Sequence, residues 1–94
     1  MSNKKLFNNA KNWLYRKFDA LERKNPYDTE EILLFHKGDY VILIRSSGQV
    51  RYYYKFANLL DKIFPLDRGD FELILINWIA DNYKIKVTSI YPFT

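Results

Sequence analysis

Residues 40–55 read YVILIRSSGQVRYYYK, and the alternation of side chains on either side of a glycine predicts a β-hairpin. A three-residue loop at Ser46-Ser47-Gly48, with the glycine in the left-handed conformation, gathers six apolar or aromatic side chains on one face. In that register Ile44 pairs with Val50, Ile42 with Tyr52, and Tyr40 with Tyr54. A two-residue turn at Ser47-Gly48 would instead place Arg51 and Lys55 beside the isoleucines. Because a half-buried sheet separates its two faces, we expect the three-residue loop.

The opposite face of this hairpin mixes cationic, polar and aromatic side chains. It carries Arg45, Arg51, Tyr53 and Lys55, together with Val41, Leu43 and Gln49. Aromatic rings interleaved with cations on an open sheet can stack nucleobases and hold backbone phosphate, so these residues predict a binding surface. The alternative is that the N-terminal helix covers Val41 and Leu43, which would leave Tyr53 half-buried at the rim.

Upstream of the hairpin, residues 31–37 fit two interpretations. Glu31–His36 can form a strand that turns at Lys37-Gly38-Asp39. Alternatively, Asp28-Thr29-Glu30-Glu31 can cap a short helix that ends at Gly38. We prefer the strand, because it completes a three-stranded antiparallel meander with the hairpin.

The N-terminal residues predict an amphipathic helix that ends at Asn25-Pro26, since a residue before proline is pushed out of the helical region. On a helical wheel the apolar arc contains Leu6, Phe7, Ala10, Trp13, Leu14, Phe18, Ala20 and Leu21. We expect this arc to pack inward, with Trp13 and Phe18 as its largest side chains. Lys17 lies at the edge of the arc, where its stem can follow the apolar surface.

The same helix carries the charge imbalance of the chain. The first 24 residues hold seven basic and two acidic side chains, whereas the remaining 70 hold eight basic and nine acidic ones. Its outer face presents Lys5, Asn12, Arg16 and Arg23, which are suited to phosphate and to base edges. The alternative is the ordinary solvated face of a surface helix. A membrane-surface helix is weaker, because the core needs the apolar arc.

Two further helices are expected after the hairpin. The apolar spacing of Phe56–Phe64 is helical, and a proline follows it. Next, Asp67–Asp70 predicts a turn, with Asp70 as the N-cap of a helix over residues 71–82. That helix would bury a stripe formed by Phe71, Ile74, Leu75, Trp78 and Ile79. Its β-branched residues leave a strand over Phe71–Ile79 as the alternative.

The C-terminal residues predict a strand over Lys84–Tyr91 that Pro92 closes. Its side chains alternate, with Ile85 and Val87 inward and Lys84 and Lys86 outward. The chain is therefore expected to form one α+β domain over residues 1–94, with an N-terminal amphipathic helix, an antiparallel β-meander, two further helices and a C-terminal strand. Helices would cover one face of the sheet and leave the other partly open.

Composition removes several classes of function. There is no cysteine, which excludes disulfides, thiolate metal sites and a cysteine nucleophile. His36 is the only histidine, and beside Asp39 it fits a turn as well as a general acid. The acidic residues Asp67, Asp70 and Glu72 lack the spacing of a calcium loop. With no glycine-rich phosphate loop and no base placed beside a serine, we expect no metal, no cofactor and no catalytic set.

The sequence predicts a small non-enzymatic protein that binds an acidic partner, with nucleic acid or a nucleoprotein favoured. Abundant asparagine, lysine, isoleucine and tyrosine suit AT-rich coding, which fits a regulatory or accessory role of the mobile-element type. The alternative is a protein–protein interaction module, such as an inhibitor of a larger enzyme or a homodimer. A metal-independent RNase is a distant third. No signal peptide and no membrane-length apolar run are evident, so we expect a cytoplasmic protein.

Overall fold

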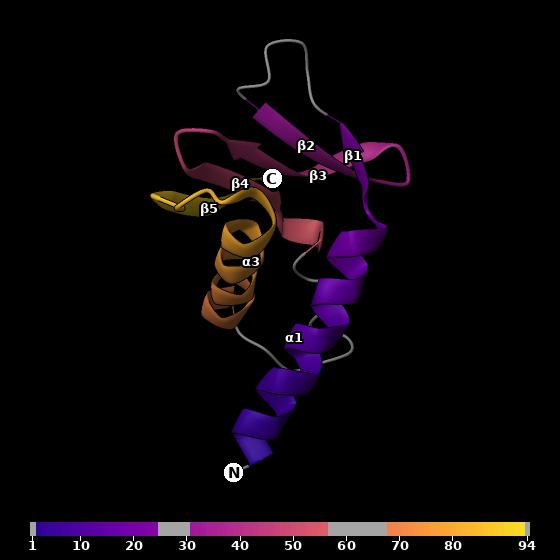
Figure 1. Ribbon diagram of the computed structural model, residues 1–94. Helices are drawn as coiled ribbons and strands as arrows, with labels where there is room; N and C mark the ends of the chain where they lie inside the picture. The colour runs from indigo at the N-terminus through magenta and orange to yellow at the C-terminus, as the bar shows by residue number, and fades with distance from the viewer. Residues whose placement is uncertain (1, 25–30, 57–67, 94) are drawn as a thin grey trace.

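The computed structural model describes residues 2–24, 31–56 and 68–93, and it confirms an α+β fold (Figure 1). A five-stranded sheet forms one layer, and two helices lie together on one side of it. In chain order the elements are α1 (Ser2–Ala20), β1 (Glu22–Lys24), β2 (Glu31–His36), β3 (Asp39–Arg45), β4 (Gln49–Tyr53), α3 (Arg68–Tyr83) and β5 (Ser89–Phe93).

The strands lie in sequence order across the sheet, from β1 to β5. The first four are antiparallel neighbours, whereas β5 runs parallel to β4. This parallel pair follows from the connection, because α3 carries the chain back to the end of the sheet where β4 began. The expected meander is therefore present, and it is extended by one strand at each edge.

The extra strand β1 corrects the predicted end of the first helix. The helix was expected to continue to Asn25, but α1 ends at Ala20 and Glu22–Lys24 pairs with β2, with Arg23 opposite Leu34. The cause is a tertiary contact. Hydrogen bonds to the edge of β2 satisfy backbone N–H and C=O groups that would be hydrogen-bonded only to water at a frayed helix end. Arg23 therefore lies on a strand and not on the helix face predicted for it.

The hairpin confirms most of the predicted register. Residues 31–36 form the preferred strand, and Lys37 and Gly38 both have positive φ in the turn that follows. Gly48 has a φ of 98°, and its N–H donates to the carbonyl of Arg45 at 2.8 Å, as the three-residue loop requires. Ile44 lies opposite Val50 and Ile42 opposite Tyr52. All four of these strand side chains are buried.

The predicted pairing of Tyr40 with Tyr54 is wrong. The register between β2 and β3 steps from Leu34↔Ile42 to Phe35↔Tyr40, so Val41 is the extra residue of a β-bulge. Successive residues of β2 point to opposite faces, and the bulge therefore moves Tyr40 to the face opposite Ile42. Tyr54 begins a helical turn instead, with the guanidinium carbon of Arg68 3.8 Å from the centre of its ring.

The region after the hairpin confirms a helix over residues 71–82, with all five stripe residues buried. However, α3 begins by Arg68, so the predicted turn over residues 68–70 and the N-cap role of Asp70 are wrong. Asp70 lies in the first turn, where its negative charge still complements the helix dipole. Phe56 is helical, as predicted, but Tyr54 and Lys55, which were predicted to continue the hairpin, belong to the same helical turn. The rest of the predicted Phe56–Phe64 helix lies outside the described residues.

The C-terminal strand forms later than predicted. Residues 84–87 have no regular structure, and β5 spans Ser89–Phe93. Lys84 has a φ of 58°, and its N–H donates to the carbonyl of Ala80 at 3.1 Å, which ends α3 in a left-handed cap. Pro92 lies inside β5 and does not close it, because an edge strand tolerates a residue without an N–H.

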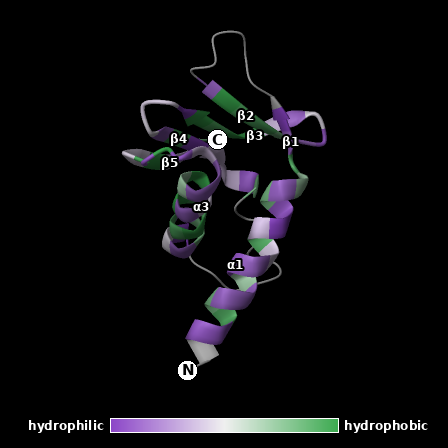
Figure 2. Cartoon of the chain, in the orientation of Figure 1, coloured by the Kyte–Doolittle hydropathy of each residue, from purple (hydrophilic) through white to green (hydrophobic). Residues whose placement is uncertain are grey.

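The core lies between the two helices and one face of the sheet. Phe18 of α1 has its ring centre 5.0 Å from that of Trp78 of α3, and Tyr52 of β4 lies 5.1 Å from Phe71. Leu14 and Phe18 are buried as expected, whereas Phe7 and Trp13 pack against the core while partly exposed. Figure 2 shows α1 alternating between hydrophilic and hydrophobic residues and α3 with a larger share of hydrophobic ones.

The other face of the sheet has a different environment. Both helices lie on the core side, and among the described residues no helix or strand covers the second face (Figure 1). We call this second face the open face. Within the same described part of the chain, no helix is long and apolar enough to cross a membrane.

Candidate nucleic-acid interface

The strand registers place the side chains of the open face in two rows that run across the sheet. One row joins Leu33, Leu43, Arg51 and Tyr91, which are paired from β2 to β5. The next row joins Phe35, Tyr40, Tyr53 and Phe93, from the same four strands. Because neighbouring strands are about 4.8 Å apart, each residue of a row is within side-chain contact of the next residue in that row.

The second row forms a continuous group of rings, here called the ring cluster: Phe35, Tyr40, Tyr53 and Phe93. The ring centres are 4.5 Å apart for Tyr53 and Phe93, 5.8 Å for Tyr40 and Phe93, and 6.1 Å for Tyr40 and Tyr53. Phe35 lies 6.3 Å from Tyr40 in an edge-on arrangement. Tyr40 is 37% exposed and the other three are half-buried, so the cluster presents aromatic surface to solvent.

Arg51 and Tyr91 form a paired cation and ring beside the cluster. The Nε–H of Arg51 donates to the Tyr91 hydroxyl at 2.7 Å, and its guanidinium carbon is 5.2 Å from the centre of the Tyr91 ring. Both residues are exposed, so the guanidinium keeps donors free for a ligand. Lys55, also exposed, comes two residues after Tyr53, just beyond the end of β4.

Arg45 is less available than the sequence suggested. Its Nε lies 3.1 Å from a carboxylate oxygen of Glu31, across the β2–β3 pair. The two side chains remain partly exposed, so the pair contributes little to stability, but it offsets the positive charge at this end of the open face. Among the predicted residues of the hairpin, Arg51, Tyr53 and Lys55 therefore retain the stronger binding chemistry.

The predicted residues of α1 do not join this surface. Lys5, Asn12 and Arg16 are exposed and lie within 40° of one line along the helix, on the basis of 100° per residue. We call this line the α1 surface. Because α1 packs against the core side of the sheet, the α1 surface and the open face belong to different sides of the molecule (Figure 1).

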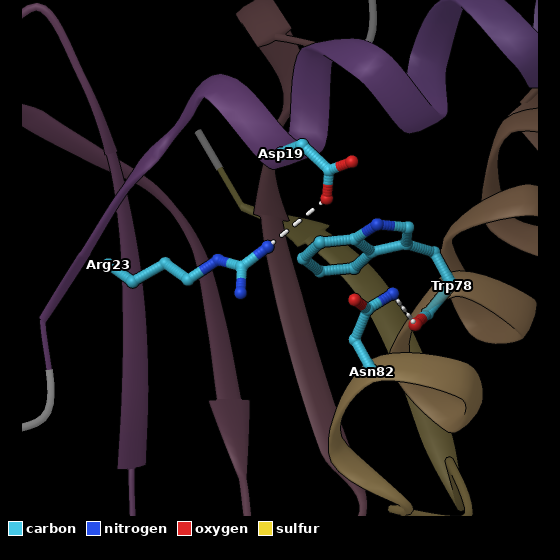
Figure 3. Close-up of polar contacts among 4 residues, drawn as sticks. All are labelled: Asp19, Arg23, Trp78 and Asn82. Atoms are coloured by element: carbon cyan, nitrogen blue, oxygen red, sulfur yellow. Dashed lines mark hydrogen bonds and ion pairs between the residues drawn. The ribbon is translucent and has the colours of Figure 1, made fainter.

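Arg23 lies beside Asp19 and the ring of Trp78 (Figure 3). Its guanidinium is 3.3 Å from a carboxylate oxygen of Asp19. The guanidinium carbon is also 5.4 Å from the Trp78 ring and 5.8 Å from the Tyr83 ring. These contacts join β1 to α1 and α3 on the core side of the sheet, which gives Arg23 a structural role.

An open hollow of about 400 Å³ lies at the end of the sheet, next to the ring cluster. Its described lining residues join the β2–β3 turn to the end of β4 and are His36, Lys37, Asp39, Val41, Tyr53, Lys55 and Phe56. Burial, and then the nearby ammonium groups of Lys17 and Lys37, lower the pKa of His36 below its usual value of 6.5. The imidazole is therefore neutral at pH 7.

The buried polar groups on the core side serve the fold. The Tyr52 hydroxyl donates to a Glu72 carboxylate oxygen at 2.5 Å, and burial followed by this hydrogen bond raises the pKa of Tyr52 well above its usual range. The hydroxyls of Tyr15 and Tyr83 are buried and have no hydrogen-bond partner among the described residues. In the described ranges, no three histidine, aspartate or glutamate side chains are grouped so as to hold a metal ion.

Sequence reasoning missed part of the open face. Tyr91 and Phe93 alternate with Pro92, so their shared face could have been read from the sequence, but only if β5 had been placed beside β4. Tyr40 was assigned to the wrong face because the bulge at Val41 leaves no clear signal in a single sequence.

Comparison of the chain with protein-family models, curated proteins and solved structures finds no match. The functional interpretation therefore rests on the geometry of the open face, the hollow and the α1 surface.

Proposed function

We propose that this protein binds single-stranded nucleic acid on the open face of its sheet, in a regulatory or accessory role that involves no reaction. The observation that carries the proposal is the ring cluster, in which Tyr40 and Tyr53 contact Phe93 on the open face. Arg51 and Lys55 stand at the borders of the cluster. Rings for bases and cations for backbone are the two components of a single-strand site.

The exposed aromatic surface of the site favours a single strand over a duplex. In a duplex the faces of the bases are stacked on one another and are inaccessible to protein rings. In a single strand each exposed base can stack on an aromatic side chain, which is worth about 1–3 kcal/mol per base. The half-buried rings of Tyr53 and Phe93 are held in place by their neighbours, so little side-chain freedom is lost on binding.

The α1 surface supplies a second, less specific contribution. Lys5 and Arg16 are exposed cations that attract phosphate irrespective of base sequence. Since this surface lies on another side of the molecule, a strand that occupies the ring cluster does not also lie along α1. We therefore assign recognition to the open face and long-range attraction to α1.

A protein partner is the second candidate, and one observation favours it. Leu33 and Leu43 lie side by side in the row next to the ring cluster and are only partly buried. Together with the rings they make an apolar strip of the kind found at the centre of protein interfaces. An acidic partner protein or a second copy of this chain would bury that strip.

Fluorescence anisotropy with labelled single-stranded DNA, single-stranded RNA and duplex DNA, at two salt concentrations, tests the proposal. We expect both single strands to bind more tightly than the duplex, and we expect Tyr40→Ala/Tyr53→Ala to weaken binding at least tenfold. Leu73→Ala, at a 49% exposed position on α3, is the control and should bind normally. Absence of binding to all three at low salt would overturn the proposal, and self-association detected by sedimentation would favour the protein-partner alternative.

A further inference from the structure

The hollow at the end of the sheet is continuous with the ring cluster. Tyr53 belongs to both, because it lines the hollow and its ring lies 6.1 Å from that of Tyr40. A base stacked on the exposed side of Tyr53 would therefore have the hollow beside it. The side chains around the hollow decide which part of a nucleotide it can accept.

Positive charge dominates that lining. Lys37 and Lys55 line the hollow, and Asp39 is the one carboxylate among its described lining residues. Both lysines are exposed, and within the described part of the chain neither forms an ion pair. Lys17 approaches from α1 closely enough to act on His36. The hollow thus combines free ammonium groups with a concave shape, which concentrates an anion.

His36 adds directional hydrogen bonding to this charge. Burial keeps its imidazole neutral at pH 7, in which state one ring nitrogen donates and the other accepts. A phosphate group offers several acceptor oxygens at once, so it can engage two ammonium groups and an imidazole N–H together. A carboxylate has fewer oxygens, and a metal cation is disfavoured by the surrounding lysines.

We propose that the hollow binds a phosphate group, with Lys37, Lys55 and His36 as its ligands, and that this phosphate belongs to the nucleotide whose base stacks on Tyr53. The second half of the proposal rests on the proposed function. The first half concerns only the chemistry of the hollow and applies equally to inorganic phosphate. The single strand is thereby placed with its base on the open face and its backbone at the end of the sheet where β4 finishes.

An NMR titration with inorganic phosphate tests the hollow on its own. The ionic strength is held constant with chloride, and the imidazole signals of His36 are followed. We expect a saturable shift of these signals and a rise in the pKa of His36. Bound phosphate is negative, like the neighbouring Asp39, and so favours the charged imidazole, whereas the positive charges of Lys17, Lys37 and Lys55 oppose it.

A charge-matched pair of variants identifies the ligands. Lys37→Gln/Lys55→Gln removes two charges from the hollow, and Lys84→Gln/Lys86→Gln removes two exposed charges from the segment before β5. The first variant should lose the saturable shift of His36, and the second should keep it. A linear response in the unmodified protein, or a saturable shift that survives in Lys37→Gln/Lys55→Gln, would overturn the phosphate site.

The single strand then tests whether the site belongs to the proposed function. Lys37→Gln/Lys55→Gln should reduce the slope of log affinity against log salt by about one, as for one lost phosphate contact. Tyr53→Ala should weaken binding with the slope unchanged. Binding with an unchanged slope in the lysine variant would overturn the phosphate assignment and leave the function standing. A saturable response to phosphate without any binding of nucleic acid would overturn the function and leave the anion site.

Discussion

Tyr52 and Tyr53 are neighbours in β4, yet they lie on opposite faces of the sheet and have opposite environments. Tyr52 is fully buried, its ring lies 5.1 Å from that of Phe71, and its hydroxyl donates a hydrogen bond to Glu72. Tyr53 is partly exposed and packs 4.5 Å from Phe93 on the open face. The same side chain therefore supports the fold on one face and is available for recognition on the other.

This contrast indicates where aromatic residues are needed for stability in this chain. On the core face the rings of Phe18, Phe71 and Trp78 fill the space between the sheet and the helices. On the open face the rings of Tyr40, Tyr53 and Phe93 pack on one another. Loss of a core ring leaves a cavity, whereas loss of an open-face ring leaves a gap that water fills. Two of the predictions below, on a pair of phenylalanines and on a pair of tyrosine hydroxyls, set a core-face change against an open-face change.

The largest expected effect comes from a matched pair of phenylalanines. Phe71→Ala should lower the free energy of unfolding by about 3–5 kcal/mol, because the ring is buried and contacts Phe18, Tyr52 and Phe56. Phe93→Ala should cost about 1 kcal/mol, the order of an aromatic pair contact. Urea denaturation measures both. Equal losses would show that the open face is as tightly packed as the core.

The second effect distinguishes two glycines of positive φ. Gly38 has a φ of 89° with open space where a Cβ would lie, so Gly38→Ala should cost about 1–2 kcal/mol from backbone conformation. Gly48 has a φ of 98°, and a Cβ there would clash with the Lys86 carbonyl oxygen. Gly48→Ala should therefore cost more, and the amide of Thr88, which donates to the Gly48 carbonyl at 2.8 Å, should lose hydrogen-exchange protection.

That comparison bears on the open face because Gly48 holds the start of β5 against the hairpin. Displacement of β5 would move Phe93 away from Tyr53 and so disturb the ring cluster. Gly38→Ala should leave the cluster intact and is the control. If the two variants lose the same stability, the close approach at Gly48 does not contribute.

A smaller effect separates the hydroxyls of the two neighbouring tyrosines. Tyr52→Phe removes the hydrogen bond to Glu72 and should cost about 1.5 kcal/mol at neutral pH, whereas Tyr53→Phe should cost little. Burial, then the Glu72 hydrogen bond, raises the pKa of Tyr52, so the folded chain keeps a proton that the unfolded chain releases above about pH 10. The contribution of Tyr52 to the stability of the fold is therefore present below about pH 10 and is lost as the pH rises above that value.

Denaturation at a series of alkaline pH values tests this linkage. The decline in stability above about pH 10 should be shallower in Tyr52→Phe than in the unmodified protein. A residual decline is expected, because burial also raises the pKa of Tyr15 and Tyr83. An unchanged slope in Tyr52→Phe would mean that the Tyr52–Glu72 pair does not stabilise the folded state.

The smallest effect concerns His36, at the boundary of the two faces. Burial, with Lys17 and Lys37, lowers its pKa in the folded state, so the unfolded chain binds the proton more tightly. Stability should therefore fall as the pH drops below about 6.5 and level off once the folded imidazole is also protonated. In His36→Gln this acid-side decline should flatten. If the stability of His36→Gln declines by the same amount, groups other than His36 cause the acid-side decline.

The local rules of the hairpin predicted much of this fold. Gly48 and the alternation around it were enough to obtain the register from Ile44–Val50 to Ile42–Tyr52. The buried stripe on α3 was evident from its helical spacing. The failures arise from interactions across the chain. Glu22–Lys24 forms a strand because it pairs with the edge of β2, and the side-chain pattern of those three residues does not predict this strand.

The candidate site was half predictable for the same reason. Arg51 and Tyr53 follow from the hairpin register alone, whereas Lys55 lies in the helical turn after β4. Tyr40 needed the bulge at Val41, and Phe93 needed the parallel pairing of β5 with β4. Both depend on long-range contacts that a pattern of neighbouring residues does not contain. The basic helix was recognised, but its separation from the open face required the three-dimensional arrangement.

Mapping of a bound single-stranded oligonucleotide by NMR tests the central claim most directly. Amide and aromatic signals would be followed during titration with a short strand at low salt. We expect the strongest perturbations on Tyr40, Arg51, Tyr53 and Phe93, and we expect Tyr40→Ala/Tyr53→Ala to abolish them. Perturbations confined to the α1 surface, at Lys5, Asn12 and Arg16, with unchanged affinity in that variant, would contradict it.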